Sequence, residues 1–236
     1  IEGALKAPLA GLEVALKILG TTAGGWLQVD LSGEDERIAT NYLIQEVGLC
    51  PSSLESLEKF STVKGYIQKI GKTELTVDIG VFQPKIVHAT VPLRHLQAEL
   101  VDDRKLALKK IAELFGFCEG LPVNLKVNGL NKEENRMESE LASEQIRKYA
   151  VWEESLLDRL LVIGPSLQEI KATIERARLE RDVIDVEPLG MFEHALTCKL
   201  GTDAVGLIPK FGRMLKNACF SVFNAKTVMK FLKKLE

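Results

Sequence analysis

The sequence has 236 residues, of which 46% are hydrophobic and 27% are charged, and its net charge is −2. These are ordinary globular values, and the length predicts two or three domains. No apolar run reaches bilayer length and no signal-peptide pattern opens the chain, so we predict no membrane partner. The first residue is Ile1 rather than Met, so we expect the true N-terminus to lie upstream.

Residues 1–59 are predicted to form an N-terminal α+β unit. Alternating apolar residues over 12–19 and 26–31 predict the two strands of a hairpin. A helix opens at Ser32 or Gly33, and its first turn is acidic, as the helix dipole favours. No His or Cys stands near these acidic residues, so no metal site is predicted. The order strand, strand, helix matches the later part of a ferredoxin-like unit. We therefore expect this unit to be incomplete, without its first strand and helix.

Residues 60–142 are predicted to form a barrel of the oligonucleotide-binding (OB) kind with a helical insert. Three alternating strands, a helical crossing and two further strands are the order of a partly open five-stranded barrel. Gly65 and Gly80 lie where such a barrel must bend. The predicted strands cover 62–70, 74–80, 85–91, 122–127 and 135–141, and the predicted helices cover 94–100 and 106–115.

Residues 143–236 are predicted to form a C-terminal ferredoxin-like α+β domain. The order of elements after its first helix is β-α-β-β-α-β. Ser166 and Glu169 have the spacing of a capping box. The predicted strands cover 160–163, 182–186, 192–200 and 219–223, and the predicted helices cover 143–157, 166–177, 204–215 and 225–235.

The turn before the third of these helices is a candidate anion site. The backbone N–H groups of Gly201, Thr202 and Ala204 stand at a helix N-terminus, where anions can bind. The alternative is an ordinary N-cap by Thr202 or Asp203, whose carboxylate would repel a phosphate. Pro209 predicts that the helix kinks or starts late.

No catalytic residue is predicted. His88, His95 and His194 are scattered, and no Ser or Cys pairs with one of them by spacing. His194 alternates with apolar neighbours, which favours a satisfied core or domain-interface histidine over a ligand. The four cysteines are far apart and lack a CxxC pair, which favours buried thiols in a reducing cytoplasm over a disulfide or zinc framework. We predict no cofactor.

The charge is unevenly distributed. Residues 1–59 hold four basic and nine acidic residues, whereas residues 60–130 hold ten basic and seven acidic. Residues 201–236 hold seven basic and two acidic residues. Two mildly basic regions are compatible with a polyanionic partner.

The central segment resembles the S-one type of OB-fold RNA-binding repeat found in a large ribosomal protein. In that family the barrel face binds single-stranded RNA through aromatic and basic side chains. This copy departs from the pattern, because its strands offer only Tyr66, with Phe82 in a loop and His88 on the third strand. The resemblance rests on Val63-x-Gly65-Tyr66-Ile67, Leu75-x-Val77-Asp78-Ile79-Gly80, Ala89-x-Val91-Pro92-Leu93 and Gly120-Leu121-Pro122-Val123-x-Leu125-x-Val127.

The whole chain also resembles an archaeal family called domain of unknown function 2110. The residues that carry this resemblance run from Val77 to Leu93, from Gly120 to Val123 and from Leu189 to Ala204. It implies an archaeal cytoplasmic protein and no particular activity.

Three functions are compatible with these observations. The leading hypothesis is a non-catalytic RNA-binding or translation-associated protein that holds single-stranded or looped RNA on the barrel. The alternatives are a protein-interaction scaffold and an enzyme that binds a phosphorylated small molecule at Gly201–Ala204. The residues predicted to contact RNA are Lys64, Tyr66, Lys69, His88, Arg94, Lys210, Arg213 and Lys216.

Overall fold

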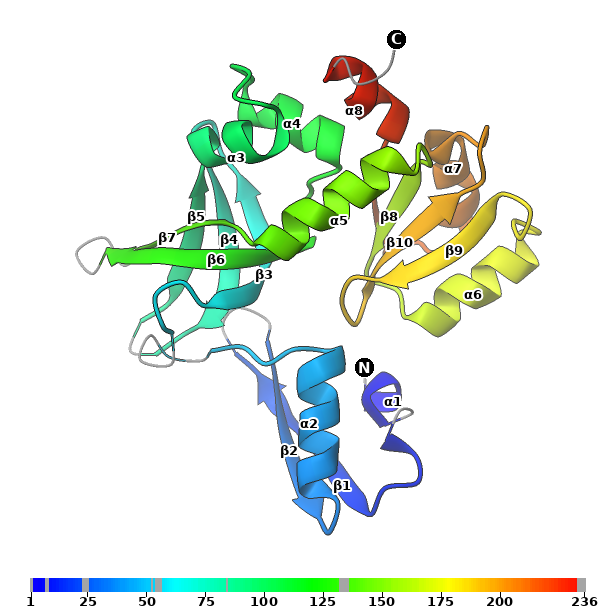
Figure 1. Ribbon diagram of the computed structural model, residues 1–236. Coiled ribbons are helices and arrows are strands. Elements are labelled where there is room, and N and C mark those ends of the chain that lie inside the picture. The colour runs from blue at the N-terminus through cyan, green and yellow to red at the C-terminus, as the bar shows by residue number, and fades with distance from the viewer. Residues whose placement is uncertain are drawn as a thin grey trace.

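A computed structural model describes residues 2–6, 9–22, 26–51, 53, 57–83, 85–131 and 136–232 of the chain. It has a mixed α+β architecture in three parts, with a barrel between an N-terminal hairpin and a C-terminal sheet (Figure 1). The mixed fold class and the central barrel predicted from the sequence are both confirmed. No helix within the described ranges combines the length and apolarity needed to cross a membrane.

The N-terminal part is an antiparallel hairpin covered by helices. The predicted order of strand, strand and helix is confirmed, and a short helix precedes it. Its small core contains Leu5, Leu9, Leu16 and Ala39. Its elements are α1 (Glu2–Lys6), β1 (Val14–Thr21), β2 (Leu27–Gly33) and α2 (Glu36–Glu46).

The central part is a closed barrel with strand order β3-β4-β5-β7-β6. Only the β5–β7 pair is parallel, and two helices connect β5 to β6, as in an OB fold. Gly65 permits the close approach of β3 and β4, since a Cβ there would lie 2.7 Å from the carbonyl oxygen of Asp78. The elements are β3 (Thr62–Ile70), β4 (Glu74–Val81), β5 (Val87–Pro92), α3 (Leu93–Leu100), α4 (Leu108–Phe115), β6 (Pro122–Asn131) and β7 (Arg136–Leu141).

The C-terminal part is an antiparallel sheet of order β11-β8-β10-β9. In chain order this is 4-1-3-2, which confirms the predicted ferredoxin-like arrangement. The capping box of Ser166 and Glu169 is also confirmed. The elements are α5 (Ser143–Glu154), β8 (Arg159–Ile163), α6 (Leu167–Arg176), β9 (Val183–Pro188), β10 (Glu193–Cys198), α7 (Ala204–Met214), β11 (Cys219–Phe223) and α8 (Ala225–Phe231).

The two faces of this sheet pack on different partners. Leu160, Val162 and Leu196 share a core with residues of α6 and α7. Leu161 and Ala195, which alternate with them, belong to the core of the barrel. Helix α5 bridges the sheet and the barrel (Figure 1). The domain boundary predicted at residue 142 therefore falls at the start of a helix whose side chains enter the shared core.

His194 and Pro209 refine two expectations. His194 is only 1% exposed, as predicted for a core residue, and burial lowers its pKa. Its Nδ1 has no hydrogen-bond partner among the described residues, so it is buried but not fully satisfied. Helix α7 begins at Ala204 with Pro209 inside it, so it does not start late.

Candidate nucleic-acid interface

The outer face of β3 carries Lys64 and Tyr66, since Val63, Gly65 and Ile67 point into the barrel. The ring of Trp26 packs edge-on against Tyr66, with 5.3 Å between the ring centroids. Burial raises the pKa of Tyr66 well above its ordinary value. The predicted stacking platform is thus covered on one side by the N-terminal part.

The other barrel residues predicted to contact RNA lie apart from one another. Lys69 is exposed, and its side chain has no ion pair among the described residues. His88 is half-buried on β5. Arg94 on α3 forms an ion pair of 2.5 Å with Glu138 of β7, so part of its charge is already compensated.

Lys210, Arg213 and Lys216 lie in and just after α7, which covers the face of the C-terminal sheet that does not meet the barrel. All three are exposed, and Lys210 lies 3.8 Å from a carboxylate oxygen of Asp182. The structure therefore does not join these residues and the barrel residues into one surface.

The turn at Gly201, Thr202 and Ala204 borders a cavity of about 220 Å³. Asp203 caps α7 by accepting a hydrogen bond of 3.0 Å from the backbone N–H of Val205. Asp158 adds a second carboxylate to the cavity lining. Asp203 is therefore the N-cap, as the alternative interpretation predicted. Lys199 and Lys226 also line the cavity, so two ammonium groups stand beside the two carboxylates.

Phe60, which no strand or helix pattern in the sequence marks, carries the most exposed aromatic ring on the barrel among the described residues. Phe60 is 61% exposed and has a positive φ of 70°. The ammonium nitrogens of Lys59 and Lys126 lie 5.0 Å and 5.6 Å from its ring centroid. The sequence signal was the Lys-Phe pair just before β3, but Lys126 reaches the ring only through the pairing of β3 with β6.

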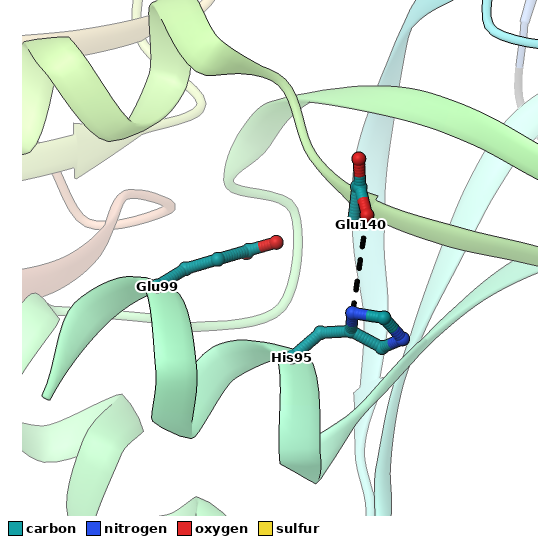
Figure 2. Close-up of side chains that lie close together, drawn as sticks. All are labelled: His95, Glu99 and Glu140. Atoms are coloured by element: carbon teal, nitrogen blue, oxygen red, sulfur yellow. Dashed lines mark ion pairs between the residues drawn. The ribbon is translucent and has the colours of Figure 1, made fainter. Parts of the chain in front are cut away.

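A polar network lies next to this ring, between α3 and the strands β6 and β7. Figure 2 shows His95 and Glu99 projecting from one helix toward Glu140 on a strand. His95 and Glu99 are four residues apart on α3, which places their side chains on the same face of the helix. Their ligand atoms and those of Glu140 lie within 4.8 Å of one another, so the three could hold a divalent cation.

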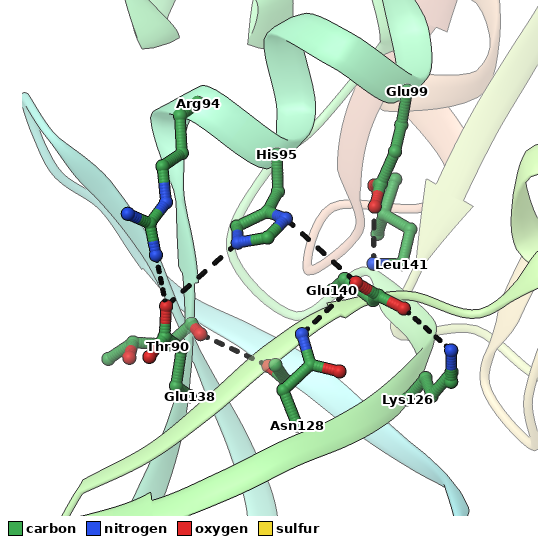
Figure 3. A network of polar contacts seen from close by, with 10 residues as sticks. Thr90, Arg94, His95, Glu99, Lys126, Asn128, Glu138, Glu140 and Leu141 are labelled. Carbon is green, nitrogen blue, oxygen red and sulfur yellow. Dashed lines mark hydrogen bonds and ion pairs between the residues drawn. The ribbon is translucent and has the colours of Figure 1, made fainter. Parts of the chain in front are cut away.

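The carboxylates of this network differ in their environments (Figure 3). Lys126 and Asn128 donate hydrogen bonds of 2.9 Å and 3.0 Å to Glu140, and these bonds lower its pKa. Burial raises the pKa of Glu99 to about 7. Both oxygens of Glu140 already accept a hydrogen bond, one from Lys126 and one from Asn128. The network is therefore already close to charge balance without a bound cation.

Solved structures similar to this chain share little sequence with it. The alpha subunit of aIF2 from Pyrococcus abyssi is 12% identical over 71% of this chain and 96% of its own, with a TM-score of 0.29. The a/eIF2alpha–aDim2p–rRNA complex from Pyrococcus horikoshii OT3 matches at 14% identity over 52% of this chain and 60% of its own, also with a TM-score of 0.29. An uncharacterised protein from Methanocaldococcus jannaschii matches at 14% identity over 37% of this chain and 95% of its own, with a TM-score of 0.27. At these low scores the likenesses carry no inference about function.

No curated protein sequence matches the chain. Three family models match it in succession, and together they span nearly all of it. They are the DUF2110 N-terminal domain over residues 1–53, the DUF2110 central domain over residues 57–153 and the DUF2110 C-terminal domain over residues 157–223. The chain belongs to the DUF2110 family.

Proposed function

We propose that this protein binds single-stranded or looped RNA, without catalysis, on the outer surface of its barrel. The observation that carries the proposal is the ring of Phe60, which is exposed and accompanied by two ammonium groups. An exposed aromatic ring offers a surface on which a base can stack, and the ammonium group of Lys59 attracts the phosphate backbone. The charge of Lys126 is already paired with Glu140, as that of Arg94 is with Glu138.

The backbone of Phe60 supports this role. A positive φ is unfavourable for a bulky residue, and such conformations occur where the surrounding structure or a function requires them. The backbone N–H of Phe60 donates to the carbonyl oxygen of Val127, which fixes the ring beside β6. Leaving a large apolar ring in water has no benefit for folding, whereas a stacking partner would bury it.

The proposed contact surface differs from the one predicted from the sequence alone. The sequence places the centre of the surface at Tyr66, but Trp26 covers that ring, so we propose Phe60 as the centre instead. Lys59 and Lys126 supply the nearest charges, and Lys69 and Arg94 remain proposed contacts at its margins. The cytoplasmic location, the archaeal origin and a translation-associated role stay predictions, as do the scaffold and small-molecule enzyme alternatives.

Fluorescence anisotropy with a labelled single-stranded RNA of about 12 nucleotides, titrated at several salt concentrations, tests the proposal. Stacking is worth about 1–3 kcal/mol per base, so Phe60→Ala is expected to weaken binding by roughly 5- to 150-fold. Lys59→Gln is expected to weaken binding less and to flatten the salt dependence, because one phosphate contact is lost.

Two matched variants control for general surface effects. Ile86→Ala removes another exposed apolar side chain of the barrel segment, and Lys105→Gln removes an exposed lysine elsewhere on it. Both are expected to bind RNA as the unaltered protein does. Equal affinity of Phe60→Ala and Ile86→Ala, or no RNA binding at low salt, would contradict the proposal.

A further inference from the structure

A cavity of about 330 Å³ lies where the three parts of the molecule meet. Its walls come from the barrel, from α5, from the end of α2 and from the turn that follows β9. Its size falls at the lower end of the range that holds small-molecule ligands. The residues whose chemistry matters here are Lys64, Asn124, Gln145, Lys148, Tyr149 and Trp152.

Lys64 is an unusual lining residue because its charge has no close partner. Its side chain forms neither a hydrogen bond nor an ion pair within the part of the chain that the structure describes. Burial lowers the pKa of Lys64, the carboxylate of Glu193 opposes this effect, and the charge of Lys148 adds to it. A half-buried ammonium group without a contacting partner is unfavourable, and an anion in the cavity would stabilise it.

Lys148 brings a second ammonium group to the same cavity. It forms a 2.9 Å ion pair with Glu187, and the indole N–H of Trp152 donates to the other oxygen of that carboxylate. Lys148 is therefore held in place on the wall by an anchored partner. Its charge is already paired with Glu187, so Lys64 supplies the unpaired positive charge of the cavity, which favours an anionic ligand over a neutral one.

The remaining walls are rigid. Gln145 is 5% exposed, and its side-chain oxygen accepts a hydrogen bond from the backbone N–H of Asn124. Tyr149 and Trp152 are buried and pack edge-on against each other, with 5.5 Å between their ring centroids. A site whose walls do not need to be ordered on binding loses less entropy when a ligand enters.

We propose that this cavity binds a small phosphomonoester. Lys64 is its main counter-charge, Lys148 is the second, and the aromatic wall packs against the organic part of the ligand. Since all three parts of the molecule line the cavity, the bound ligand ties them together. The proposal is independent of RNA binding at Phe60, which lies outside this cavity.

Thermal unfolding of the intact protein with inorganic phosphate and with adenosine 5′-monophosphate, followed by calorimetric titration, tests the proposal. We expect the midpoint temperature to rise with the concentration of the monophosphate, and adenosine without a phosphate to have no effect. Lys64→Gln is expected to weaken binding at least tenfold, and Lys64→Arg to retain most of it. Glu193→Gln is expected to tighten binding, because it removes the carboxylate that faces Lys64.

Lys72→Gln is the matched control, since it removes an exposed lysine from the turn that follows the same strand. Lys64→Gln should fold normally, because it removes a half-buried charge without a contacting partner, and circular dichroism checks this. The proposal is overturned if neither compound raises the midpoint temperature at millimolar concentration, or if Lys64→Gln and Lys72→Gln weaken binding equally. Loss of RNA binding in Phe60→Ala with intact monophosphate binding would separate the two sites.

Discussion

The barrel meets the C-terminal sheet through a continuous core, whereas it meets the N-terminal hairpin through a few side chains. At the first junction Phe223 of β11 packs against Phe115 of the barrel, with 6.1 Å between their ring centroids, and against Trp152 of α5 at 5.3 Å. At the second junction Trp26 covers Tyr66, and the hairpin keeps its own small core.

The C-terminal helix strengthens the first junction. Ala225 and Val228 of α8 are fully buried in the core of the barrel. Arg104, in the loop between α3 and α4, donates hydrogen bonds to the backbone carbonyls of Phe231 and Leu232. The barrel and the C-terminal sheet are therefore one packed body. It follows that the covered face of β3 depends on the smaller junction with the hairpin. The inferred ligand cavity is lined by residues from both sides, by α5 of the packed body and by α2 of the hairpin part.

Phe223→Ala is expected to have the largest effect. Phe223 has no exposed surface, and removing a buried ring of this kind costs about 3–5 kcal/mol. Urea unfolding is followed by circular dichroism and by tryptophan fluorescence. We expect the midpoint urea concentration to fall by the same amount in both signals. Val151→Ala, at a 55% exposed position on α5, is the control and should change little. A loss below about 1 kcal/mol would mean that this junction is not a core.

Trp26→Ala tests the smaller junction. An aromatic pair contributes about 0.5–1.5 kcal/mol beyond the area that it buries, so we expect a loss of about 1–2 kcal/mol. Hydrogen exchange should show weaker protection in β1 and β2 and unchanged protection in β8 and β10. If β8 and β10 lose protection to the same degree, the two junctions are not energetically separate.

Asp203→Ala removes the N-cap of α7, which packs on the sheet face away from the barrel. Its effect on the unfolding free energy shows how large a change is when neither junction is altered. Loss of an N-cap side chain costs about 1 kcal/mol of unfolding free energy. Asp203→Asn keeps an oxygen acceptor and should retain most of the stability. The unfolding free energies of the two variants check this, and equal losses in both would show that the cap does not matter.

Glu99→Gln is expected to have the smallest effect, visible as a change in pH dependence. The pKa of Glu99 is raised from 4.5 to about 7 in the folded protein, so the folded state holds this proton more tightly than the unfolded state. Its contribution to stability is complete below pH 4.5 and is lost as the pH rises toward 7. The group is partly exposed, so we expect a change of about 1 kcal/mol or less across this window.

Chemical unfolding at pH 5 and at pH 8 measures the effect. The difference in unfolding free energy between the two pH values should shrink in Glu99→Gln, because glutamine does not titrate. Glu113→Gln, at an exposed position on α4, is the control and should leave the difference unchanged. A pH dependence identical to that of the unaltered protein would show that Glu99 titrates normally.

Local patterns predicted most elements of the fold. The alternation over residues 62–70 gave the bounds of β3 to the residue, and Ser166 with Glu169 gave the start of α6. These signals act between neighbours in the chain, so the sequence contains them directly. The candidate site was harder to predict, because exposure depends on which segments pack together. Strand alternation predicts an open Tyr66, which Trp26 covers, whereas no strand or helix pattern marks Phe60, which is exposed.

Strand alternation, helical spacing and caps are local properties, so the class of the fold, the order of its elements and several of their ends follow from the amino-acid sequence. Four contacts emerge only once the chain is folded: Trp26 on Tyr66, Lys126 at Phe60, Lys64 with Lys148 in one cavity, and His95 with Glu99 and Glu140. Each of these contacts joins residues from separate elements. Their distances are set by how whole surfaces bury one another, and a local pattern in the chain does not record this.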